Sequence, residues 1–401
     1  MKHFFTLCKI LTAFLFLFSG IVKANDPLGF SYKLDEYWEV FGMLWMQPYS
    51  LYISIVVCSI EVALGLITLL GLRMRQTSWL LLLMMLFFLF LKISTVCNNY
   101  FIDHPEASFS VFFTKLFSLK VENLSYMKDC GCFGDAIKFE PWQSLLIDIV
   151  SLFPILVLFA NRYEIERTSS LVGIKGDVAG GASILASFAF TLYCFWHLPI
   201  VDFRPFKIGN NISEKMIGVP DSIKYMYVLK NKASGETKEF EQFPENYQEQ
   251  WDYVEAKQTI LKKGIEAPIH DFFVTDMETG EDITDSLLHN PNYSFWVVVY
   301  DVKKASHKAD KGLNDLEQEC EKKGIQFIGL TASLDNEVED YRHDVQTLYP
   351  YYLCDATPLK TMIRSNPGLM LIKNGTVIAM WHYNDVPSFN EIKDKYSINV
   401  N

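Results

Sequence analysis

Five long apolar segments in the first half of the chain constrain its fold more than any other feature. Each is close to the roughly 20 residues that a helix needs to cross a bilayer. Backbone polar groups inside a bilayer must be satisfied internally, which favours helices for such segments. We therefore predict an α-helical membrane bundle of about five transmembrane helices over residues 1–200. The five segments are Phe4–Val22, Leu51–Leu72, Trp79–Val96, Trp142–Ala160 and Ala179–Ile200.

Charge separates the two halves of the chain. Residues 1–200 carry 14 Lys+Arg against 15 Asp+Glu, whereas residues 201–401 carry 22 against 32. An apolar, nearly neutral half in contact with membrane lipid is thus followed by an acidic, water-exposed half. The acidity argues against nucleic acid as a partner, because no basic surface is indicated.

Basic residues near the ends of the spans predict the orientation. Cytoplasmic loops are enriched in Lys and Arg, and one arrangement places all the basic connections on that side. The N-terminus is then cytoplasmic, and the loops 23–50 and 97–141 and residues 201–401 are external. In a bacterial inner membrane the C-terminal half would be periplasmic. The basic residues are Lys2, Lys9, Arg73, Arg75, Arg162, Arg167 and Lys175.

The first span has a second interpretation. Lys2, the apolar run and Val22-Lys23-Ala24 also imitate a signal peptide with a small-residue cleavage site. Cleavage there would leave the orientation of the other spans unchanged.

Strand-like and helix-like segments alternate in the last third of the chain. The apolar run Phe295–Tyr300 and the segment Gln326–Leu330 read as strands, with helical patterns over Leu313–Lys323 and Asn336–Leu348. Asn374-Gly375 then predicts a two-residue hairpin turn between Gly368–Lys373 and Thr376–Trp381. This order predicts an α/β domain with a mixed sheet over residues 266–401.

Residues 201–265 read as a juxtamembrane linker with a hairpin and a helix. Tyr225–Leu229 and Glu236–Phe240 are expected to pair around Ala233-Ser234-Gly235. Residues 244–263 are rich in Glu, Gln and Lys and are expected to form a surface helix.

Two cysteines separated by a single glycine form the motif that most suggests thiol chemistry. The motif is Lys128-Asp129-Cys130-Gly131-Cys132-Phe133-Gly134-Asp135. A disulfide within such a pair is strained and easily reduced. The predicted external location permits disulfides. Cys130 and Cys132 are therefore candidate catalytic residues, and a structural disulfide involving these two and Cys97 is the alternative. A metal site is weakly indicated, because no histidine stands at ligand spacing, and none is predicted.

Three ionisable residues fall inside predicted spans: Glu61, Lys92 and Asp148. A charge in a span is costly and suggests either function or an interhelical ion pair that fixes packing. We treat the three, together with Cys97, as candidate partner or supporting residues of the cysteine pair.

Four motifs in the first 160 residues or so carry a resemblance to a known family. They are Phe18-Ser19-Gly20-Ile21-Val22-Lys23-Ala24, Asp26-Pro27-Leu28-Gly29 with Lys33, Glu61-Val62-Ala63-Leu64-Gly65 with Leu69-Leu70-Gly71, and Asp129-Cys130-Gly131-Cys132-Phe133-Gly134 with Pro141-Trp142. Together they resemble DoxX/MauE-type membrane proteins, in the Bacteroidetes version of that family. The resemblance implies a small helical bundle and a part in extracytoplasmic thiol–disulfide handling, since MauE is implicated in maturing the disulfide-rich methylamine dehydrogenase. A quinone near the outer face of the bundle is a further hypothesis, tied to no particular residue.

From Ala267 to about residue 395 the chain resembles a thioredoxin-like domain. Ser365-Asn366-Pro367-Gly368-Leu369 matches the loop that carries the family's cis-proline. Where that family has Cys-x-x-Cys, this chain reads Lys303-Lys304-Ala305-Ser306-His307-Lys308. The resemblance therefore implies a domain without its own redox pair, which binds a client beside Asn366 and Pro367.

Two functions follow from these features. In the first, Cys130 and Cys132 exchange disulfides with periplasmic protein thiols. In the second, the protein is a membrane-anchored scaffold or assembly factor, its cysteines are structural, and its soluble domain binds a client. Both hypotheses, and with them the question of enzymatic activity, stay open at this point.

Overall fold

The structure is a computed structural model that describes residues 2–108, 110, 126–127, 131, 134–167, 173–262 and 264–396. Within this part of the chain, five helices are long and apolar enough to cross a membrane, as predicted. The fifth ends at Trp196 rather than Ile200, because His197 turns into extended backbone and Pro199 restricts the residue before it. The five are α1 (Lys2–Asn25), α3 (Ser50–Leu70), α4 (Met74–Asp103), α6 (Pro141–Ala160) and α8 (Ile174–Trp196).

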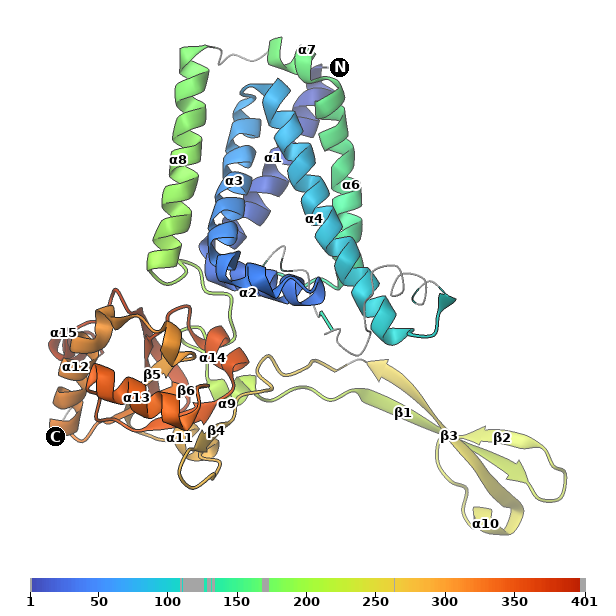
Figure 1. Cartoon of the computed structure of the whole chain (residues 1–401). Coiled ribbons are helices and arrows are strands. Elements are labelled where there is room, and N and C mark those ends of the chain that lie inside the picture. Colours follow the sequence, from blue (N-terminus) through green and yellow to red (C-terminus); the bar gives the residue numbers. More distant parts are fainter. Residues whose placement is uncertain are drawn as a thin grey trace.

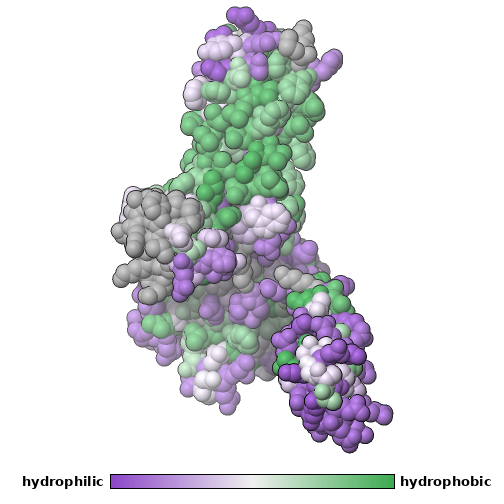
Figure 2. Space-filling model, turned by 90° about the vertical axis from the view of Figure 1, so that its right-hand side faces the viewer, coloured by the Kyte–Doolittle hydropathy of each residue, from purple (hydrophilic) through white to green (hydrophobic). Residues whose placement is uncertain are grey.

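The five helices pack into a bundle, and one end of this bundle faces the α/β domain (Figure 1). The short helix α7 (Arg162–Arg167) lies at the end away from that domain. At this end Arg73 contacts Asp177 at 2.5 Å. Figure 2 shows hydrophobic residues covering the visible face of the bundle between the two hydrophilic ends. This distribution is the one that a bilayer requires.

A helix that the sequence analysis did not predict lies across the lower end of the bundle (Figure 1). Helix α2 (Pro27–Val40) follows α1 at once and leads to the 3₁₀ helix η1 (Leu44–Tyr49). Asp26 caps α2 by accepting a hydrogen bond from the Gly29 N–H, and Pro27 occupies the first turn. Apolar residues of α2, including Leu34 and Tyr37, pack against the bundle.

The α/β domain contains a six-stranded mixed sheet in the described residues, in the order β4-β7-β6-β5-β8-β9. Strands β5, β6 and β7 are parallel, and β4, β8 and β9 run antiparallel to their neighbours. This topology is consistent with a thioredoxin-like domain and confirms the predicted fold class. The strands are β4 (Val274–Asp276), β5 (Tyr293–Val299), β6 (Gln326–Thr331), β7 (Tyr351–Cys354), β8 (Gly368–Lys373) and β9 (Thr376–His382).

Two turns in this domain agree with the sequence analysis. Asn374 and Gly375 both have positive φ, at 47° and 68°, as a tight hairpin turn between β8 and β9 requires. The peptide bond between Asn366 and Pro367 is cis.

Helices cover both faces of this sheet, so β5 is buried on both sides, which explains its unbroken apolar run. Phe295 and its alternate residues face α12, α13 and α15. Trp296 and its alternates face α14 and a segment that includes Phe206 and Ile212 from the predicted linker. The helices are α9 (Ile212–Lys215), α11 (Thr284–Leu288), η3 (Val302–Lys304), η4 (His307–Ala309), α12 (Asp310–Lys322), α13 (Asp335–Val345), α14 (Ala356–Met362) and α15 (Phe389–Tyr396).

A three-stranded antiparallel sheet projects from the molecule as an arm (Figure 1). Strands β1 (Ser222–Asn231) and β2 (Thr237–Phe240) form the predicted hairpin. The predicted helix over residues 244–263 is wrong. One helical turn, α10 (Tyr247–Gln250), is followed by the long strand β3 (Trp251–Lys262). Strand β3 pairs with β1 along its whole length, and this pairing outweighs the helix-like composition of residues 251–262.

Candidate functional site

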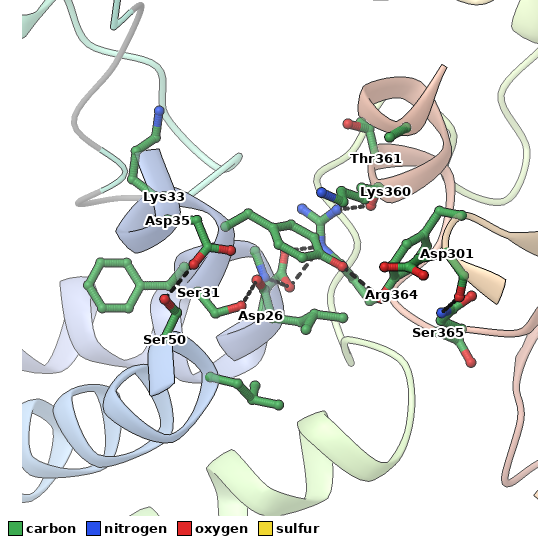
Figure 3. Close-up of a pocket in the computed structure, with 18 of the residues that line it drawn as sticks. Asp26, Ser31, Lys33, Asp35, Ser50, Asp301, Lys360, Thr361, Arg364 and Ser365 are labelled. Carbon is green, nitrogen blue, oxygen red and sulfur yellow. Dashed lines mark hydrogen bonds and ion pairs between the residues drawn. The ribbon is translucent and has the colours of Figure 1, made fainter. Parts of the chain in front are cut away.

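A cleft of about 1360 Å³ lies between the lower end of the bundle and the α/β domain (Figure 3). Helix α2 forms one wall. The opposite wall consists of the residues after β5, helix α14 and the loop with the cis-proline. Gly131, Gly134 and Asp135 of the dicysteine loop also line it. Three segments that are distant in the sequence thus meet at one cavity.

Arg364, directly before the cis-proline loop, joins these segments. Its Nε lies 2.9 Å from Asp26 Oδ1 and 2.8 Å from Asp26 Oδ2, and its Nη2 lies 3.2 Å from Asp135 Oδ2. Its Nη1 donates to the Lys360 carbonyl. The Arg364 side chain is 7% exposed. Burial alone lowers the pKa of Arg364, but Asp26 and Asp135 outweigh it and raise that pKa, so the guanidinium stays charged.

The close approach of Arg364 to α2 depends on Gly29. A Cβ atom at this position would lie 2.4 Å from Asp26 Oδ2 and 2.9 Å from Arg364 Nη2. Any larger residue would therefore push the carboxylate and the guanidinium apart.

A pair of tyrosines makes a second contact across the cleft. The Tyr32 hydroxyl of α2 donates to the Tyr300 hydroxyl at 3.0 Å, and the two rings meet edge to face. Burial is the main cause that raises the pKa of both phenols, so both hydroxyls stay protonated at neutral pH. The Lys360 ammonium lies 5.1 Å from the centre of the Tyr32 ring.

Contacts from the C-terminal end of α8 and from the segment after it complete the docking of the α/β domain on the bundle. The Asn25 side chain donates to the Val201 carbonyl at 2.8 Å and accepts from the Val201 N–H at 3.1 Å. The Asn384 amide donates to the Trp196 carbonyl at 2.8 Å. His197 Nδ1 lies 2.8 Å from the Asp385 carboxylate.

The candidate catalytic residues Cys130 and Cys132 lie outside the described residues. Gly131 between them is described. It has φ of 66°, and a Cβ there would lie 2.7 Å from Cγ of Lys33. Gly134 donates its N–H to the Gly131 carbonyl at 3.2 Å. The described residues of this motif are thus packed against α2 and tied to Arg364 through Asp135.

Of the two candidate client-binding residues, Asn366 lies on the opposite wall of the cleft, whereas the buried Pro367 does not line it. The Asn366 carbonyl accepts from the Ser306 N–H at 2.9 Å, and its side-chain amide donates to the Asp301 carbonyl at 2.7 Å. Ser306 belongs to Lys303–Lys308, the segment that the thioredoxin resemblance aligns with Cys-x-x-Cys. Among the described residues that line the cleft, none is a cysteine.

The three candidate charged residues of the spans form buried ion pairs. Lys92 of α4 lies 2.6 Å from Asp148 of α6 and also donates to the Ser144 carbonyl at 3.1 Å. Glu61 of α3 lies 2.6 Å from Lys23 of α1. The sequence analysis missed Lys23, because the residue stood in a cleavage-site-like pattern.

The remaining cysteines of the described chain are free thiols. Cys97 is half-buried in α4 and does not line the cleft. Cys320 and Cys354 are fully buried in the α/β domain, and burial raises the pKa of each thiol to about 12. Both thiols therefore stay protonated at neutral pH and pack as small apolar residues.

Asp26, Tyr32 and Arg364 are site residues that sequence reasoning missed. Asp26-Pro27 has the residues of a helix start, a capping side chain followed by proline, which could have located α2. The partners of Tyr32 and Arg364 depend on long-range contacts, for which a single sequence carries no signal.

The chain was compared with known proteins. No curated protein matches it. The family model of methylamine utilisation protein MauE matches residues 1–100, which include α1, α2, α3 and most of α4 but not the dicysteine motif. Over this first quarter, the chain is similar to the MauE family of membrane proteins.

Proposed function

We propose that this multi-pass membrane protein takes part in extracytoplasmic thiol–disulfide exchange, with Cys130 and Cys132 as the exchanging pair. The similarity of residues 1–100 to MauE supports a maturation or redox role. The observation that carries the proposal is the cleft, in which Arg364 ties Asp135 of the dicysteine motif to the cis-proline side of the α/β domain.

The proposal places the α/β domain in the periplasm of a bacterial inner membrane and the N-terminus in the cytoplasm. Its support is the distribution of basic residues. Arg73, Arg75, Arg162 and the N-terminus lie at the end of the bundle away from the α/β domain (Figure 1). Positive charge at one end favours the cytoplasmic side for that end.

The exchange consists of two thiol–disulfide steps. A client thiolate attacks the disulfide between Cys130 and Cys132, which forms a mixed disulfide and releases one loop thiolate. The second client thiolate then attacks the client sulfur of the mixed disulfide, which gives an oxidised client and a reduced loop. Two electrons thus move from the client to the loop. The same two steps in the reverse direction would reduce a client disulfide.

In this proposal the α/β domain positions the dicysteine loop and does not itself exchange disulfides. It has Lys303-Lys304-Ala305-Ser306 where a redox pair would stand, and its two cysteines are buried. Asn366 and Pro367 would contact the client or the loop beside it.

Trapping of a mixed disulfide tests the proposal. Cys130→Ser and Cys132→Ser variants of the full chain are expressed, cells are acid-quenched and alkylated, and disulfide-linked adducts are identified by mass. One single variant is expected to accumulate an adduct with a periplasmic protein, and the matched control Cys97→Ser is expected to accumulate none. If neither variant forms an adduct at normal protein abundance, the exchange role is wrong.

A non-catalytic scaffold is the second candidate, and one observation favours it. The α/β domain has Lys303-Lys304-Ala305-Ser306 where a redox pair would stand, and its Cys320 and Cys354 are buried. For a scaffold, the double variant Cys130→Ser/Cys132→Ser would lower the abundance of the protein without changing the redox state of any client.

A further inference from the structure

The interior of the helical bundle holds four charged side chains from four helices. They form the ion pairs Lys23–Glu61 and Lys92–Asp148, and none of the four side chains is more than 8% exposed. A single buried pair is sufficient to fix two helices together. Two pairs side by side in one bundle call for a further explanation.

A cavity of about 20 Å³ touches all four charged side chains and Ser19. The rest of its wall is apolar and includes Phe16, Met85 and Phe88. A site for one water molecule needs roughly 10–15 Å³ and two or more polar partners. The cavity meets both conditions.

One atom at this cavity lacks a hydrogen bond. Asp148 Oδ1 contacts Lys92, but Asp148 Oδ2 is buried and has no hydrogen-bond partner among the described residues. A buried carboxylate oxygen without a donor is unfavourable, and a water molecule in the adjoining cavity would supply that donor.

One residue, Lys23, connects the small cavity to the cleft between the bundle and the α/β domain. Lys23 lines the cleft as well as the small cavity. Its ammonium contacts both oxygens of Glu61, at 2.9 and 2.6 Å. Polar groups thus lead from the cleft into the bundle, along Lys23 and Glu61 to Lys92 and Asp148.

We propose that the cavity binds one water molecule, which bridges the two ion pairs and completes a path for protons between the cleft and Asp148. When a proton enters at the Lys23–Glu61 pair, the Glu61 carboxyl passes a proton to the water, and the water passes one of its own protons to Asp148 Oδ2. The net change is one proton transferred from Glu61 to Asp148, with no change in any bond between heavy atoms and no electron transfer. The inference goes beyond the proposed function, because no cysteine takes part.

Infrared difference spectroscopy after a pH jump tests this path on the full chain in lipid nanodiscs. Ser19→Leu fills the cavity without removing a charge. The matched control is Thr12→Val, since Thr12 is buried on the same helix but does not line the cavity. The carboxyl band of Asp148 is assigned by its loss in Asp148→Asn.

In the unmodified chain and in Thr12→Val, we expect a water band that shifts in H₂¹⁸O and a change in the Asp148 carboxyl band. In Ser19→Leu the water band should vanish. The change in the Asp148 carboxyl band should slow by about tenfold or more, which corresponds to an activation barrier higher by ~1.4 kcal/mol. The absence of an isotope-sensitive band in the unmodified chain would overturn the proposal, even if Ser19→Leu fails to fold. Equal carboxyl kinetics in Ser19→Leu and Thr12→Val would also overturn it. Neither result depends on the redox state of Cys130 and Cys132.

Discussion

Arg364 is the side chain on which the docking of the α/β domain most depends, because it contacts carboxylates from two separate segments of the membrane domain. Arg364→Met would leave Asp26 and Asp135 without their cation in a partly buried site. Loss of one partner of a buried ion pair costs about 3–5 kcal/mol, and less where solvent reaches the carboxylates. We expect faster proteolysis in the segment after α8, measured on the full chain in detergent.

Arg342→Met is the matched control for this prediction. The partly buried Arg342 forms an i, i+3 pair with the exposed Glu339 on α13, and pairs near the surface contribute about 0–1 kcal/mol. If both variants are cleaved at the same rate as the unmodified chain, Arg364 does not hold the two parts together.

Gly29 gives a second prediction at the residue scale. Replacing a helical glycine by alanine usually stabilises a helix by roughly 0.5–1 kcal/mol. Gly29→Ala should instead lower the melting temperature, because its Cβ would collide with Asp26 and crowd Arg364. Gly181→Ala in α8, where a Cβ meets nothing within 4 Å, is the control and should be neutral or stabilising. Equal stabilisation by both substitutions would contradict the tight contact at Arg364.

At the scale of elements, strand β9 carries a buried histidine that should make the α/β domain sensitive to acid. Burial, opposed in part by Asp385, lowers the pKa of His382 to about 4, and the Asn384 N–H donates to its Nδ1 at 3.2 Å. His197 and Lys308 lie nearby and lower the pKa of His382 further. The folded state therefore holds the neutral imidazole, whereas the unfolded chain takes up a proton below about pH 6.5.

Since the unfolded state binds more protons between pH 6.5 and 4, stability contributed by His382 is present above that window and is lost as the pH falls through it. We expect the melting temperature to fall over this range in the unmodified chain and to fall less in His382→Gln. The control His289→Gln, at an exposed histidine, should leave the pH dependence of the melting temperature unchanged. A profile that is identical in all three proteins would show that His382 is not the titrating group.

Sequence reasoning found those elements that local signals define. The five spans follow from the length of their apolar runs, and the β8–β9 hairpin from Asn374-Gly375. It failed at β3, because a Glu-, Gln- and Lys-rich segment resembles a surface helix until its pairing with β1 is known. It also missed α2, although Asp26-Pro27 has the residues of a helix start.

The candidate site was predictable to a smaller extent. Glu61, Lys92 and Asp148 stand out because charges are rare in apolar spans. Lys92 and Asp148 prove to be partners, but Glu61 pairs with Lys23, which lies at the end of its own span. The cleft itself arises from contacts between residues more than 200 positions apart, such as Asp135 and Arg364, and no local pattern encodes such a contact.

At the scale of the whole molecule, the chain joins a membrane bundle, similar in its first part to MauE, to an α/β domain whose mixed sheet is consistent with a thioredoxin-like fold. Residues of both parts line the cleft between them. The cis-proline side of the domain lies against the described residues of the dicysteine motif, so that the two parts together would form one exchange site.

The redox state of Cys130 and Cys132 during a reductant pulse tests the exchange role most directly. Cells that express the full chain are treated briefly with dithiothreitol, washed, acid-quenched at intervals and alkylated, and the two cysteines are read by mass. The account predicts that the pair becomes reduced, is reoxidised after the wash, and is reoxidised more slowly in Arg364→Met. A pair that stays in one state throughout, in both proteins, would contradict the account.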